Sequence, residues 1–126
     1  MPQITLDYTN NLNPDINFEI LFSEIHQKLN EVAGIKIGNC KSRAIKLDNY
    51  FIAAGEDKNA FVHIDVRMLS GRTIEIKKKL GEEILLIIKR YFSKFVEKFD
   101  LQITVEIQDI ERAFYFKYPD GTLKYN

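Results

Sequence analysis

The sequence opens with Met1-Pro2, and Pro2 is the first residue whose position indicates chemistry. Removal of the initiator methionine, which a small second residue favours, would leave Pro2 with a free secondary amine. Such an amine has an unperturbed pKa of about 8, and burial beside cations lowers that pKa because both effects disfavour the ammonium form. A base that titrates near neutral pH suits proton abstraction next to a carbonyl group. Pro2 is therefore a candidate general base, although many chains begin with Met-Pro for no catalytic reason.

Three cationic side chains are candidates for binding an anionic substrate. Lys41 and Arg43 stand two positions apart in an alternating stretch, so both side chains point to the same face of a strand. Arg72 lies between a predicted strand and a predicted helix, where its side chain can reach the start of the first strand. His63 and Asp65 also share a strand face, but no serine nucleophile motif accompanies them. We therefore interpret them as a polar pair on a sheet face.

Composition limits the class of protein. The 126 residues are 45% apolar and 29% charged, which predicts one domain over residues 1–126 with a core that needs no disulfide or metal. The formal net charge is zero, so the whole molecule has no electrostatic reason to bind nucleic acid. Cys40 is the single cysteine, which excludes an internal disulfide and fits a reducing cytoplasm. The sequence shows neither a membrane-spanning apolar run nor a signal-peptide pattern.

Hydrophobic periodicity predicts four strands and two helices. The first helix is expected to include Pro14 in its first turn and to stop at Gly34. The second is expected to begin after Thr73 as its N-cap and to continue to Asp100. The Pro119-Asp120-Gly121 sequence predicts the turn of a small C-terminal hairpin within residues 114–125. The strands are predicted over residues 3–8, 40–48, 60–69 and 101–107.

The order of these elements indicates an α+β fold. Two β-α-β units would form a four-stranded sheet with two helices on one face, which is the split pattern of ferredoxin-like folds, followed by the hairpin. We expect the uncovered sheet face to carry apolar residues as well. A monomer would then expose a large apolar patch, so we expect a homo-oligomer with its sheets packed inward.

Four short segments occur in this order along the chain: Met1-Pro2, Lys41-Ser42-Arg43, Ala60-Phe61-Val62-His63 and Gly71-Arg72-Thr73. In their order and spacing they resemble the tautomerase superfamily and within it the 5-carboxymethyl-2-hydroxymuconate isomerases. The resemblance extends to chain length and element order. It implies a cytoplasmic homotrimer without cofactor or metal, in which Pro2 is the base and Arg72, with Lys41 or Arg43, binds substrate carboxylates. Close relatives are expected to have arginine at position 41. Lys41 keeps the positive charge but cannot form the bidentate hydrogen bonds that an arginine makes to a carboxylate.

The activity implied by the resemblance is enol–keto tautomerisation of a carboxylated dienol such as 5-carboxymethyl-2-hydroxymuconate. This 1,3- or 1,5-proton shift belongs to aromatic catabolism, in homoprotocatechuate degradation. The sequence independently lacks a metal-ligand cluster, a phosphate-binding glycine loop and a nucleophile motif, which agrees with a reaction that needs one base and fixed positive groups. Two alternatives remain: a tautomerase of phenylpyruvate-like enols, and a non-catalytic trimeric module that binds a ligand or supports assembly.

Overall fold

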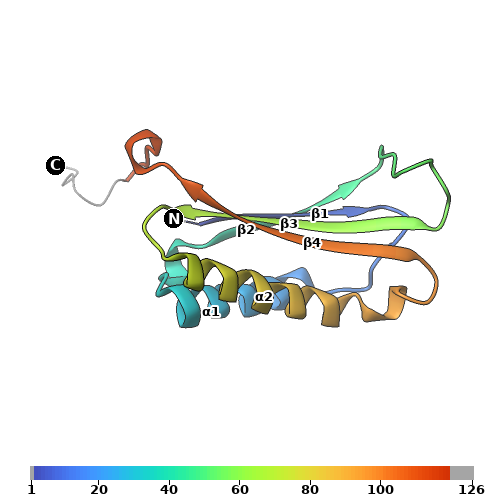
Figure 1. Ribbon diagram of the computed structural model, residues 1–126, viewed down its shortest axis with the longest axis horizontal. Coiled ribbons are helices and arrows are strands. Elements are labelled where there is room, and N and C mark those ends of the chain that lie inside the picture. The colour runs from blue at the N-terminus through green and yellow to red at the C-terminus, as the bar shows by residue number, and fades with distance from the viewer. Residues whose placement is uncertain (1, 120–126) are drawn as a thin grey trace.

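The computed structural model describes residues 2–119 as a four-stranded sheet with two helices on one face (Figure 1). The predicted α+β fold is confirmed, and each of the four predicted strands is present. The strands are β1 (Gln3–Thr9), β2 (Lys41–Leu47), β3 (Asn59–Leu69) and β4 (Asp100–Ile110), and the helices are α1 (Phe18–Ala33) and α2 (Ile74–Tyr91).

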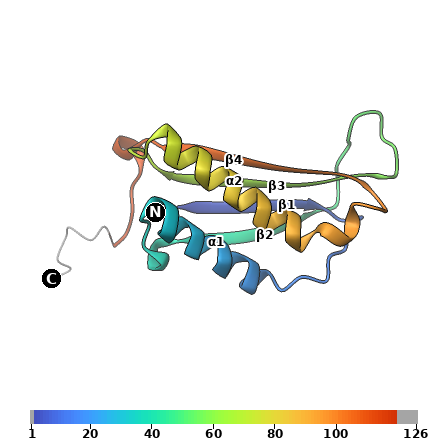
Figure 2. The ribbon, with the colours of Figure 1, turned by 60° about the horizontal axis from the view of Figure 1, so that its bottom comes forward.

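The strand order β2-β1-β3-β4 places the two halves of the chain side by side. β1 and β2 are parallel, as are β3 and β4, whereas β1 and β3 are antiparallel. Both helices therefore cross the same sheet face (Figure 2). One end of the sheet collects the starts of β1, β2 and α2 and the ends of β3, β4 and α1, at the left in Figure 1. We call this the active end; its strand register aligns Gln3 with Lys41 and Arg67.

The core lies between the sheet and the helices. β1 and β3 alternate as predicted, because every second side chain points toward the helices; these side chains are fully or almost fully buried except that of Tyr8, which is half-buried. Complete burial of one aliphatic side chain stabilises the fold by roughly 1.5–3 kcal/mol. The core residues of these elements are Ile4 and Leu6 of β1, Ala60, Val62, Ile64, Val66 and Met68 of β3, Leu21, Ile25 and Leu29 of α1, and Leu80, Ile84, Ile87 and Ile88 of α2.

A polar contact also joins the two helices at their exposed edge. Arg90 donates two hydrogen bonds to the carboxylate of Glu24, and the Tyr91 hydroxyl donates a third at 2.7 Å. The hydrogen bonds from Arg90 hold the pKa of the Glu24 carboxyl below its usual value. This network lies away from the active end and stabilises the packing of α1 against α2.

The uncovered sheet face is mainly polar, so the prediction of an apolar face is wrong, although Ile45 and Leu47 of β2 and Phe61 and Leu69 of β3 also lie on it. The physical reason is that most apolar positions of the alternating strands are on the helix side. Exposed aromatic side chains lie instead in loops and after β4: Phe51 is 79% exposed, Phe114 77% and Phe116 87%. Residues on the open face include Gln3, Thr5 and Asp7 of β1, Lys41 and Arg43 of β2, His63, Asp65 and Arg67 of β3, and Gln102, Thr104, Glu106 and Gln108 of β4.

Helix α1 begins later than predicted. Its N-cap is Asn17, whose side chain accepts a hydrogen bond from the backbone N–H of Ile20 at 3.2 Å, so Pro14 lies outside the helix. The predicted stop at Gly34 is confirmed, since Gly34 has φ 67°, a left-handed conformation that suits glycine.

Helix α2 begins as predicted but ends earlier. The Thr73 hydroxyl accepts from the N–H of Ile76 at 3.2 Å, which confirms the N-cap. The predicted continuation to Asp100 is wrong, because α2 ends at Tyr91 and a 3₁₀ turn follows over Ser93–Phe95. Phe92 and Phe95 are both buried, with ring centroids 6.0 Å apart, and the tighter turn brings both rings into the core.

After β4 the chain forms a short 3₁₀ turn, Arg112–Phe114, and residues 115–119 are not a strand. The second half of the predicted hairpin, residues 120–125 with Gly121 of its turn, lies outside the described residues. Neither helix within residues 2–119 is both long and apolar enough to span a membrane.

Candidate active site

Pro2 lies at the active end, immediately before β1, and is buried. Its carbonyl accepts a hydrogen bond from the N–H of Lys41 at 3.3 Å, which ties it to the start of β2. Pro2 stands two positions before Ile4, so the pleat places it on the helix side of the sheet. Because Gln3 pairs with Arg67 in an antiparallel register, Pro2 lies opposite Met68. The candidate base thus sits between the end of β3 and the start of β2.

Met68 also forms part of a cleft of about 240 Å³, which we call the cationic cleft. The cleft lies where α1 ends, β3 ends and the chain leaves β4. Its lining contains three cationic side chains and no carboxylate, so its charge is strongly positive. The lining residues are Gly34, Ile35, Lys36, Asn39, Met68, Leu69, Arg72 and Arg112.

Arg72 is half-buried in the cleft and bridges two backbone carbonyls. Its Nε and Nη2 donate to the Ala33 oxygen at 3.3 and 3.2 Å, and its Nη1 donates to the Leu69 oxygen at 3.4 Å. The last turn of α1 has no basic residue of its own, so Arg72 stabilises the negative end of that helix. An arginine has five N–H donors, and these contacts use three of them. Two N–H donors of Arg72 therefore remain for another acceptor.

Lys41 and Arg43 share one strand face, as predicted, and that face is the open one. Arg43 Nη1 donates to the side-chain oxygen of Gln3, whose amide nitrogen donates to the Tyr115 hydroxyl at 3.5 Å. Arg72 lies on the helix side of the same sheet. Within one chain the structure therefore groups Pro2 with Arg72 and places Lys41 and Arg43 across the sheet from them.

A family model described as 5-carboxymethyl-2-hydroxymuconate isomerase matches residues 2–120. The chain belongs to this family. It is accordingly an enzyme, an isomerase of the tautomerase superfamily.

Known proteins similar to this isomerase agree in sequence and fold. The 5-carboxymethyl-2-hydroxymuconate Delta-isomerase of Escherichia coli is 24% identical over 117 residues, covering 93% of each chain. A crystal structure of a 5-carboxymethyl-2-hydroxymuconate isomerase from Deinococcus radiodurans R1 has a TM-score of 0.82 at 29% identity, covering 92% of this chain and 87% of that one. A fused 4-OT wild-type symmetric trimer has a TM-score of 0.69 at 14% identity, covering 96% and 99%.

Sequence reasoning missed two cations of the isomerase's cleft, Lys36 and Arg112. Lys36 lies in the connection between α1 and β2, and Arg112 follows β4 by two positions. Both stand where an element ends or begins at the active end, beside the loop that carries Arg72. Their position at the ends of elements could have indicated them from the sequence, because parallel β-α-β units bring these chain ends to the same end of the sheet.

The His63–Asp65 pair on the open face is confirmed as a polar pair. His63 Nε2 lies 3.1 Å from Asp65 Oδ1, and its Nδ1 lies 2.6 Å from the Thr104 hydroxyl. With Glu106 these residues place three ligand atoms within 4.8 Å of one another, a grouping that could hold a metal ion. Exposed acidic groups commonly gather without one, and the group lies across the sheet from the cationic cleft.

Two further reactive side chains have structural surroundings. Burial lowers the pKa of His26, whose Nε2 lies 2.7 Å from the Ser42 hydroxyl in the contact between α1 and β2. Burial raises the pKa of the Cys40 thiol, which is therefore protonated near neutral pH and a poor nucleophile. Both observations favour ordinary packing over nucleophilic catalysis.

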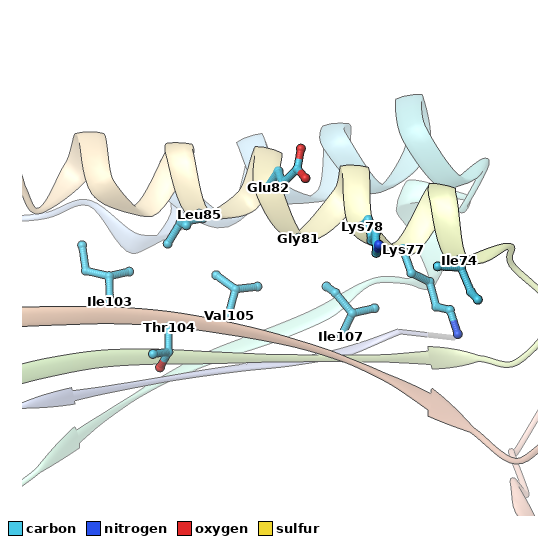
Figure 3. Close-up of a pocket in the computed structure, with 10 residues that line it drawn as sticks. All are labelled: Ile74, Lys77, Lys78, Gly81, Glu82, Leu85, Ile103, Thr104, Val105 and Ile107. Atoms are coloured by element: carbon cyan, nitrogen blue, oxygen red, sulfur yellow. The ribbon is translucent and has the colours of Figure 1, made fainter.

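A second hollow is a groove of about 730 Å³ between α2 and β4 (Figure 3). Ile103, Val105 and Ile107 point from β4 toward the helix, whereas Thr104 points away from it. Lys77 at its rim is paired with Asp109 at 3.3 Å. An open, mostly apolar groove suits a protein contact better than a small charged substrate, so size alone does not locate the reaction.

Proposed function

We propose that this isomerase catalyses the enol–keto tautomerisation of a carboxylated dienol of the 5-carboxymethyl-2-hydroxymuconate class, with Pro2 as general base. The observation that carries the proposal is that buried Pro2 stands, by the strand register, opposite Met68, which lines a cleft with three cations and no acidic lining residue. Such cations bind carboxylates through charge-assisted hydrogen bonds. They also lower the pKa of a nearby amine, because they disfavour its ammonium form.

The reaction moves one proton and rearranges one conjugated system. The free amine of Pro2 takes the proton from the enol oxygen, the carbonyl forms, and the double bonds shift toward the receiving carbon. The Pro2 ammonium then delivers the same proton to that carbon, so the base is regenerated. The two remaining donors of Arg72 would hold a carboxylate close to the reacting carbons and stabilise the negative charge that develops on the dienolate.

The substrate class is tested with protein whose Met1 has been removed, as shown by intact mass. We expect kcat/KM for the carboxylated dienol to exceed that for phenylpyruvate enol by roughly tenfold or more, because additional charge-assisted hydrogen bonds hold it. Loss of the enol absorbance measures both rates. A preference for phenylpyruvate enol would support the other tautomerase, and turnover of neither would support a ligand-binding module.

We also propose a homotrimer. The fold is shared with a protein described as a symmetric trimer, and within residues 2–119 the edge strands β2 and β4 each pair on one side only. The exposed aromatic residues and the groove beside β4 supply apolar surface for assembly. The polar open face can then face its symmetry mates through hydrogen bonds, and Lys41 and Arg43 can serve a neighbouring chain's site.

Sedimentation equilibrium at micromolar concentration tests the assembly. We expect three times the chain mass of 14.7 kDa, with no dissociation across that range. A folded monomer would contradict the trimer, and it would remove Lys41 and Arg43 from substrate binding, since they lie across the sheet from Pro2.

The cellular setting that we propose follows from composition. A formal net charge of zero gives no drive to bind nucleic acid, and a single cysteine suits a reducing cytoplasm. The family match supports a small carboxylated enol as the proposed partner and homoprotocatechuate degradation as the proposed pathway.

A further inference from the structure

Arg112 is fixed at the mouth of the cationic cleft by backbone groups. The N–H of Ser70 donates to the Ile110 oxygen at 3.0 Å, and Arg112 Nε donates back to the Ser70 oxygen at 2.8 Å. These two bonds join the end of β4 to the loop before α2. Gly71 in that loop has φ 127°, and a Cβ built there would lie 3.7 Å from Arg112 Nη2. The guanidinium therefore packs beside the Gly71 backbone, with its terminal nitrogens available.

The charges of Lys36 and Arg112 are not balanced inside the protein. Arg72 faces the carbonyl end of α1, which offsets part of its charge. Lys36 and Arg112 take part in none of the ion pairs found within residues 2–119. Like charges gathered in one cleft destabilise a folded protein by repulsion, and a bound anion reverses that effect. The ion pairs are Lys28–Glu31, His63–Asp65, Lys77–Asp109 and Arg90–Glu24.

We propose that Arg112, supported by Lys36, forms a second carboxylate-binding subsite that makes the enzyme selective for substrates with two or more carboxylates. The identity of the substrate rests on the proposed function, whereas the binding of a polycarboxylate anion at this subsite does not. Arg72 is half-buried next to Leu69 and Met68, and Met68 lies opposite Pro2. Arg72 therefore holds the carboxylate nearest the reacting carbons. Arg112 and Lys36 are exposed at the rim and hold a carboxylate farther along the substrate.

Binding of unreactive anions tests the subsite without turnover. The probes are tricarballylate, with three carboxylates, and butyrate, with one, titrated by calorimetry at low salt because salt screens exposed charges. We expect Arg112→Ala to weaken tricarballylate binding about fivefold to tenfold and to leave butyrate binding unchanged. Arg72→Ala should weaken both. Lys98→Ala is the control, because it also removes one positive charge but lies just before the start of β4, at the opposite end of the sheet. It should weaken the binding of neither anion.

Kinetics gives the second test. Arg112→Ala should lower kcat/KM for a tricarboxylate dienol about fivefold to tenfold, mainly through KM, with little change for the monocarboxylate phenylpyruvate enol. Equal losses for both anions, or no loss for tricarballylate, would overturn the subsite. If the processed protein turns over no enol while tricarballylate binding still depends on Arg112, the proposed function fails and the anion subsite stands.

Discussion

Protein that retains Met1 is expected to fold normally and to lose nearly all tautomerase activity. An amide nitrogen has no useful basicity, so a retained methionine removes the base without deleting the proline ring. General-base catalysis contributes roughly 10²–10⁴ in rate, and we expect a loss of kcat/KM in that range. The fold should be unaffected because the Pro2 carbonyl, not its nitrogen, makes the hydrogen bond to Lys41. Intact mass defines the two preparations, and dienol assays compare them.

Two further measurements identify the amine as the base. Pro2→Ala, also freed of Met1, keeps a primary amine and should keep part of the activity. In the unmodified processed enzyme, burial and the nearby cations should bring the pKa of the Pro2 amine below its unperturbed value of about 8. Activity needs the neutral amine, so kcat/KM should rise with pH through that pKa and fall on acidification. Equal turnover with and without Met1 would exclude Pro2 as the general base and require another residue to carry the proton.

The sheet was predictable because its signal is local and redundant. Residues 62–68 alternate between apolar and polar without interruption, and the burial of Val62, Ile64 and Val66 follows directly from that alternation. The helix ends were less predictable because single contacts decide them. One hydrogen bond to the side chain of Asn17, three residues after Pro14, sets the start of α1. Helix α2 ends just before Phe92, whose ring is completely buried in the core. A periodic stripe does not show where regular α-helix gives way to a 3₁₀ turn.

The site was predictable to the extent that topology dictates it. Two parallel β-α-β units bring Pro2 and the loop of Arg72 to one end of the sheet, whatever the details of the loops. Arg112 could not be placed in the same way, because its position depends on the hydrogen bonds of Ser70 and on the backbone of Gly71. Sheet alternation likewise fixes the shared face of Lys41 and Arg43, but only an assembly can bring that face to a cleft.

Arg72→Ala is expected to reduce both activity and stability. Loss of a charge-assisted carboxylate contact should lower kcat/KM roughly tenfold to a hundredfold. The Ala33 and Leu69 carbonyls also lose their arginine donors, which should cost about 1–3 kcal/mol in the free energy of unfolding. Urea denaturation measures the second effect, and assays well below the unfolding midpoint measure the first.

Arg72→Lys separates the two roles of this side chain. Lysine keeps the positive charge but cannot bridge two carbonyls with a planar fork, so stability should fall about as much as in Arg72→Ala while kcat/KM falls less. Lys98→Ala, which removes one charge just before the far end of β4, controls for the change of net charge and should alter neither quantity. If Arg72→Ala loses stability but keeps its kcat/KM, Arg72 only caps α1. Carboxylate binding would then pass to Arg112 and Lys36 in the same cleft, or to Lys41 and Arg43 of a neighbouring chain.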